Sequence, residues 1–188
     1  MRKWSLLSIP YVELHCHSGF SFLDGASHPE ELAVRAAEFG YPALALTDHN
    51  GLYGSMEFAH AARRVNVQPI TGAEVTLRDC FPGVEEPEGG HHVTLLAETP
   101  QGYANLCRLL TEAHMGSERG DTRLALPSLL ELSEGLILLS GCAQSPVAAA
   151  MRSSVADGEA FTRKLLDVFG PGSMFMELQD NAVKGDTA

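Results

Sequence analysis

YPALALTDH (residues 41–49), GSMEFAHAARR (54–64) and VQPITGAEVTL (67–77) read as a strand, a helix and a second strand. The two outer segments are apolar and of strand length, and the middle segment connects them as a helix would. Strand–helix alternation of this kind predicts an α/β domain with a parallel sheet.

The alternation continues on both sides of this stretch. Upstream, residues 11–16 predict a first strand, and His28-Pro29 opens a helix that ends at Gly40. Further strands are predicted at 91–98, 135–142 and 173–178, helices at 99–115, 128–134, 144–152 and 157–169, and loops at 79–90 and 117–127. Six strand units without a Gly-rich phosphate fingerprint favour a barrel-like winding over a dinucleotide-binding sheet.

The composition sets broad limits on function. The chain has 188 residues and is 45% hydrophobic, which predicts one domain over residues 1–188, and its net charge is −11. Such a surface repels a phosphate backbone, so work on nucleic acid would need bound cations or a basic neighbouring domain. The four cysteines form no CxxC pair, and neither a signal peptide nor a membrane span is expected. We therefore expect a cytoplasmic protein with no membrane partner.

Metal-competent side chains recur near the predicted strand ends. His15 and His17 share one face of the first strand because side chains alternate, so both can approach one ion. Asp24 follows in a turn that can bring its carboxylate back toward that strand end. His49 ends the second strand after Asp48, although this step is equally typical of a turn with an Asx hydrogen bond. Each of these signals is weak alone.

Glu74 is the stronger signal because it lies inside an apolar strand. A carboxylate there is costly unless it is paired or ligates a metal. Cys142 ends the fifth strand, where a thiol can be a ligand or a small apolar side chain. Several histidines and two carboxylates from separate strands exceed the needs of one structural zinc. They predict two or three ions that share a bridging carboxylate and hydrolyse a phosphoester.

Several long motifs together resemble a known family. HCHSGFSFLDGASHPEEL, ALALTDHNGLYG, PITGAEVTL, HHVTLLAETPQGYANLCRLL, GLILLSGC and MFMELQD are similar to the polymerase-and-histidinol-phosphatase (PHP) domain. They are most similar to the version at the N-terminus of bacterial DNA polymerase III alpha subunits, in the error-prone branch. The resemblance covers nearly the whole chain and implies a distorted (β/α)7 TIM-like barrel.

The resemblance also implies a set of metal ligands. They are His15, His17, Asp24, His49, Glu74, His92 and Cys142. Asp24 and Glu74 are the residues expected to take part in catalysis. His92 lies at the opening of its predicted strand, whereas barrel ligands are expected after theirs, so the adjacent His91 remains an alternative. Zinc is the favoured divalent ion, with manganese and iron as alternatives.

One family motif has no match in this sequence. The family carries an Asp-x-His on its seventh strand, and neither Asp180 nor Asp186 is followed by a histidine two residues later. We therefore expect a truncated PHP domain with about six of the seven strand units. The palm carboxylates of a polymerase are also absent from these residues.

The implied function is that of a module in a larger enzyme. As part of an error-prone DNA polymerase, the domain would hydrolyse phosphodiesters in a 3′→5′ exonuclease-like reaction, or would use its metals to brace the polymerase. The implied partners are DNA, the other polymerase domains in cis, and sliding clamp and translesion accessory proteins. The alternative is a free-standing phosphoesterase similar to histidinol phosphatase.

Overall fold

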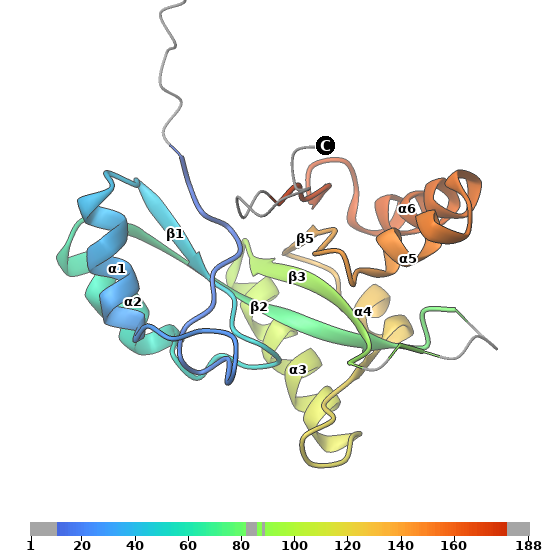
Figure 1. The fold of residues 1–188 in the computed structure, drawn as a ribbon, viewed down its shortest axis with the longest axis horizontal. Helices are drawn as coiled ribbons and strands as arrows, with labels where there is room; N and C mark the ends of the chain where they lie inside the picture. Colours follow the sequence, from blue (N-terminus) through green and yellow to red (C-terminus); the bar gives the residue numbers. More distant parts are fainter. Residues whose placement is uncertain (1–10, 82–85, 88, 180–188) are drawn as a thin grey trace, which may run out of the picture. The chain divides into compact units, whose positions relative to one another are not determined.

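The computed structural model describes residues 11–81, 86–87 and 89–179 (Figure 1). The chain divides into two compact units. Unit 1 comprises Met1–Asp48 and Leu52–Thr71, and unit 2 comprises His49–Gly51 and Gly72–Ala188. Both contain strands and helices, so the predicted α/β class is confirmed.

Unit 1 is a small parallel strand pair covered by two helices. Its elements are α1 (Pro29–Glu38), β1 (Ala43–Leu46), α2 (Ser55–Arg64) and the first residues of β2 (Gln68–Arg78). β1 pairs in parallel with Gln68–Thr71, and α1 and α2 pack against each other. Phe58, Leu46 and Ala33 are fully or almost fully buried in the core between these elements.

The predicted first strand at 11–16 is wrong. In these residues the structure has one isolated bridge, between Glu13 and Leu44. The Glu13 carboxylate accepts the backbone N–H of His15 (3.0 Å) and the Tyr11 hydroxyl (2.6 Å). Because this side chain takes a backbone donor, it competes with a continuous strand ladder.

Unit 2 contains the rest of the sheet and the remaining helices. The strands are the second part of β2 with β3 (His91–Ala97), β4 (Leu124–Ala125), β5 (Leu136–Leu139) and β6 (Met174–Phe175). The helices are α3 (Pro100–Met115), α4 (Leu126–Glu131), α5 (Pro146–Ser153) and α6 (Val155–Phe169). In the described part of this unit, the strands pair in the open order β4-β2-β3-β5-β6.

The sheet is mixed, which corrects the prediction of a parallel one. β2 and β3 are antiparallel, as are β3 and β5, whereas β5 and β6 are parallel. The described residues between β2 and β3 include no helix, and parallel neighbours normally need a helical crossover. The short β4 also lies in a segment that was predicted to be a loop.

The start of α3 is held close to the turn before β5. Thr99 caps the helix by accepting the backbone N–H of Gly102 (3.0 Å), and Asn105 donates to the Glu134 carbonyl oxygen (2.9 Å). A Cβ at Gly102 would overlap the carbonyl oxygen of Gly135. Gly135 itself has φ of +74°, a conformation that favours glycine. Both glycines are therefore required by local geometry.

None of the described helices combines the length and the apolar character needed to cross a lipid bilayer.

Candidate metal centre

Glu74 is the centre of the polar group in unit 2. It lies in β2 and is only 3% exposed. Its Oε1 atom is 3.0 Å from His49 Nδ1 and 2.8 Å from His92 Nδ1. A single buried carboxylate oxygen is thus shared by two imidazoles from two different segments.

Cys142 completes this group from the turn after β5. One ligand atom from each of Glu74, His92 and Cys142 lies within 4.8 Å of the other two. Gly141 has φ of +84°, and a Cβ there would overlap the His92 carbonyl oxygen, so the turn passes very close to β3. Cys142 and then Glu74 raise the pKa of His92 to about 10. This cluster therefore stabilises positive charge.

His49 is positioned by the residue that follows it. Asn50 has φ of +49°, donates its backbone N–H to the Glu74 carbonyl oxygen (2.8 Å), and exchanges two side-chain hydrogen bonds with Thr76, both 2.9 Å. The Asn50 carbonyl oxygen in turn accepts His114 Nε2–H (2.7 Å). These bonds fix the backbone at His49 against β2, beside Glu74.

Neither Asn50 nor His114 is among the site residues predicted from the sequence. A role for Asn50 in the turn could have been predicted, because asparagine tolerates a positive φ after a strand end. The contact of His114 with Asn50 could not have been predicted, because the two residues are 64 positions apart in the sequence.

The two adjacent histidines of β3 face opposite sides of the strand. His92 is the second residue of β3, at the opening end of the strand. It pairs across the sheet with Thr76, on the face that carries Glu74, whereas His91 pairs with Leu77. His91 is buried, and its ring makes an edge contact with Phe81 at 5.4 Å. The geometry of β3 therefore puts His92, and not His91, in the metal-competent group.

Unit 1 contains a second group made of His15, His17 and Asp24. The rings of His15 and His17 have centroids 5.0 Å apart, and His17 Nδ1 lies 2.6 Å from Asp24 Oδ2. The Asp24 carboxylate thus returns to the histidine pair, as the turn in LDG suggested.

Asp48 shapes the loop that carries this second group. It is 2% exposed and accepts three hydrogen bonds, from Ser18 N–H (2.7 Å), Ser18 Oγ (2.7 Å) and Ser21 Oγ (2.6 Å). A Cβ at Gly25 would overlap the Ser18 carbonyl oxygen, so the loop folds tightly on itself. Asp48 therefore acts as a buried anchor for the loop.

The seven predicted ligands accordingly lie in two groups, one in each unit. Imidazole, carboxylate and thiol donors fit zinc and related transition metals. The unit 2 group fits such an ion best, because Glu74 is buried and several donors surround it. The side chain of His49 is 30% exposed, so solvent reaches one side of the group.

Residues 13–181 match the family described as the PHP domain. The chain is 43% identical over 195 residues to an error-prone DNA polymerase from Symbiobacterium thermophilum, covering 95% of this chain and 17% of that protein. It is 39% identical over 188 residues to an error-prone DNA polymerase from Cutibacterium acnes, covering 95% of this chain and 16% of that protein. The chain thus spans about a sixth of the length of the curated relatives it matches.

Among solved structures, the chain is similar to a two-domain protein from Bacteroides vulgatus that contains a predicted PHP-like metal-dependent phosphoesterase. The TM-score is 0.45 with 15% sequence identity, over 88% of this chain and 49% of that chain.

Proposed function

Because this chain belongs to the PHP domain family, we propose that it binds divalent metal ions and hydrolyses phosphodiesters. The observation that carries the proposal is the buried Glu74 carboxylate, whose Oε1 contacts both His49 and His92 beside Cys142. An ionised carboxylate buried in this way needs cationic partners, and metal ions provide them.

The residues of the proposed centre would have different roles. Glu74, His49, His92 and Cys142 would hold the ions. Asn50 keeps His49 oriented, and Asp24 fixes the His17 ring through the 2.6 Å contact. The bound ions would polarise the phosphoryl oxygens and supply hydroxide near neutral pH.

The proposed ligand set also includes His15, His17 and Asp24. Support for these three comes from the likeness of HCHSGFSFLDG to the first motif of the family and from the donor types that unit 1 brings together. Zinc suits a set with imidazole and thiol donors, and manganese and iron are the alternatives.

The curated relatives supply the proposed context. We propose that the domain serves in an error-prone DNA polymerase, in cis with the polymerase domains, and that its substrate is a DNA 3′ end. The sliding clamp and translesion accessory proteins are proposed as further partners, and the cytoplasm as the location. The exposed side of His49 favours a reactive centre over a closed structural one.

The test compares metal binding and hydrolysis in matched variants. The purified chain and its Glu74→Gln variant are loaded with zinc, dialysed, and analysed for bound metal by mass spectrometry. Glu159→Gln, which changes an exposed glutamate on α6, is the control. We expect bound zinc in the wild type and the control, and its loss in Glu74→Gln.

Hydrolysis is then measured on a 5′-labelled single-stranded oligonucleotide with zinc or manganese. Shortening that depends on Glu74 supports a nuclease. Metal binding without shortening would instead favour ions that brace the fold, and rapid turnover of a small phosphomonoester would favour a free-standing phosphatase. Absence of metal binding by the wild type would refute the proposed centre.

A further inference from the structure

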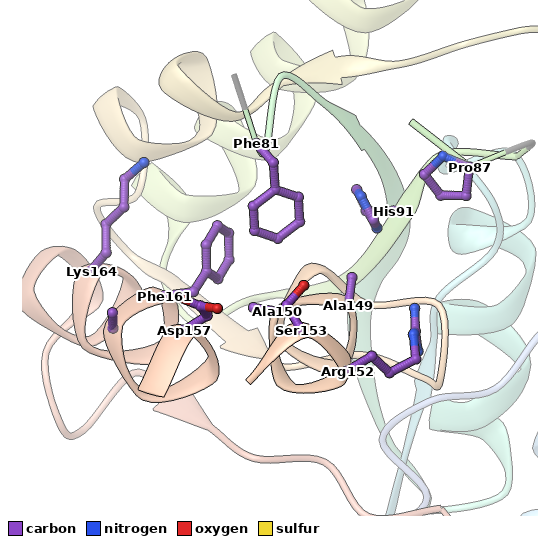
Figure 2. A pocket seen from close by; sticks show the side chains of 11 residues that line it. Phe81, Pro87, His91, Ala149, Ala150, Arg152, Ser153, Asp157, Phe161 and Lys164 are labelled. Carbon is purple, nitrogen blue, oxygen red and sulfur yellow. The ribbon is translucent and has the colours of Figure 1, made fainter. Parts of the chain in front are cut away.

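Unit 2 has a pocket of about 640 Å³ on the face of β3 opposite Glu74 (Figure 2). Described residues from the end of β2 to α6 line it, among them Phe81, His91, Arg152, Asp157, Phe161 and Lys164. This volume lies within the range of about 300–1,000 Å³ that is typical of small-molecule sites.

One side of the pocket is aromatic. The rings of Phe81 and Phe161 have centroids 5.2 Å apart, and Phe81 also contacts His91 edge-on. The buried His91 ring lies edge-on to Phe81 and adds a further flat surface to this side of the pocket. A planar ring entering the pocket would find aromatic faces and edges to pack against.

Two cationic side chains, Arg152 and Lys164, lie among the residues that line the pocket. Figure 2 shows Lys164 and Arg152 on opposite sides of the pocket, with the Phe81 and Phe161 rings between them. In the described part of the chain, neither cation makes an ion pair with a carboxylate. Lys164 lies 5.9 Å above the Phe161 ring, and Arg152 donates to the Ala143 carbonyl oxygen (2.9 Å).

Among the described residues of the lining, Asp157 is the one acidic group, and it already has a partner. The Asp157 carboxylate accepts the Ser154 hydroxyl (2.7 Å) at the start of α6. The described lining residues therefore include two cations and one carboxylate, although acidic residues outnumber basic ones 24 to 13 in the chain. This local excess of positive charge would attract an anion.

We propose that this pocket binds a small ligand that joins a planar aromatic ring to an anionic group, the chemistry of a nucleoside monophosphate. The ring packs beside Phe81 and Phe161, and the anion lies against Arg152 or Lys164. Because the pocket and Glu74 lie on opposite faces of β3, this site is distinct from the metal centre.

The experiment is titration calorimetry of the 188-residue chain with deoxyadenosine 5′-monophosphate in the presence of a chelator. The chelator removes metal ions, so phosphate binding at the metal centre does not contribute to the signal. Deoxyadenosine and inorganic phosphate are titrated separately as ring-only and anion-only probes. We expect both to bind at least about tenfold more weakly than the nucleotide.

Variants then locate the binding. Arg152→Gln and Lys164→Gln each remove one exposed cation of the rim, and we expect at least one of them to weaken nucleotide binding about tenfold. Ala149→Leu fills the pocket and should reduce binding further. Arg163→Gln, which removes the cation next to Lys164 outside the pocket lining, is the matched control and should bind like the wild type.

The proposal is overturned if the nucleotide does not bind at millimolar concentration. It is also overturned if both rim variants bind as tightly as Arg163→Gln, or if phosphate alone binds as well as the nucleotide. None of these results bears on metal binding at Glu74, which is tested separately with zinc.

Discussion

Glu74 is the centre of the polar group in unit 2 because its buried carboxylate oxygen lies 3.0 Å from His49 Nδ1 and 2.8 Å from His92 Nδ1. At this scale the sequence was informative: a glutamate inside an apolar strand predicted a functional carboxylate, and the structure surrounds it with His49, His92 and Cys142. The sequence could not show whether His91 or His92 lies on the same face of the sheet as Glu74. That choice depends on the register of β3 against β2, which is set by tertiary pairing.

A substitution at Asn50 tests whether this residue positions His49 for metal binding. Asn50→Ala removes both bonds to Thr76, so the backbone at His49 should become less fixed. We expect zinc affinity to fall by roughly 10- to 100-fold, as for other residues that orient metal ligands. Competition with a chromophoric zinc chelator measures this directly.

The control is Asn66→Ala, because Asn66 also has a positive φ, +58°, but lies in the turn before β2 in unit 1. Equal zinc affinity in the two variants would show that Asn50 has no positioning role.

Cys80 links pH to stability. Burial, and to a smaller extent the charge of Glu86, raise the pKa of the Cys80 thiol to about 12. The thiol of an unfolded cysteine has a pKa of about 8.5. Above pH 8.5 the unfolded chain loses this proton while the native chain keeps it, so stability should fall with rising pH by about 1.4 kcal/mol per pH unit. Urea denaturation between pH 8.5 and 10 should show a shallower decline for Cys80→Ala. If Cys80→Ala and Cys107→Ala decline equally, Cys80 is not the group responsible.

At the scale of elements, the helices were predictable because their ends carry local signals. Pro29, Pro100 and Pro146 each lie in the first turn of a helix, and Thr99 and Ser145 cap two of these helices. Strand direction carried no such signal. β3 returns antiparallel to β2 after a connection without a described helix. Residues 11–16 form no strand, and there the Glu13 carboxylate accepts the backbone N–H of His15.

The close approach of α3 to the turn before β5 predicts a strong effect of one methyl group. Gly102→Ala would place a Cβ onto the Gly135 carbonyl oxygen and should lower the free energy of unfolding by about 1–3 kcal/mol. Urea denaturation monitored by circular dichroism provides the measurement. Gly172→Ala is the control, since a Cβ there meets nothing within 4 Å. Similar unfolding midpoints for the two variants would contradict this close packing.

At the scale of the whole molecule, metal binding should raise the thermal stability of the chain. A ligand that binds only the native chain stabilises it by about 2.7 kcal/mol at a free concentration of 100 Kd. We therefore expect zinc to raise the melting temperature of the chain and a chelator to reverse the rise. Glu74→Gln should show little response, and an unchanged wild-type melting temperature would argue against native-state zinc binding.

The class of the whole molecule was predictable, whereas its internal division was not. Alternation of apolar strands and helices is visible along the sequence, and it correctly predicted α/β. The boundary between the units falls inside β2, between Thr71 and Gly72, and nothing in the apolar run VQPITGAEVTL marks it. The prediction of one domain over residues 1–188 stays a prediction.

His91 and His92 give the molecule one property that neither site has alone. His91 lines the pocket and the next residue, His92, belongs to the possible metal group, so a shift of β3 caused by binding at one site would also move a residue of the other. Linkage then requires reciprocity: if nucleotide binding changes zinc affinity by some factor, zinc changes nucleotide affinity by the same factor. Two neighbouring residues of one strand would thus couple the binding free energies of sites on its two faces.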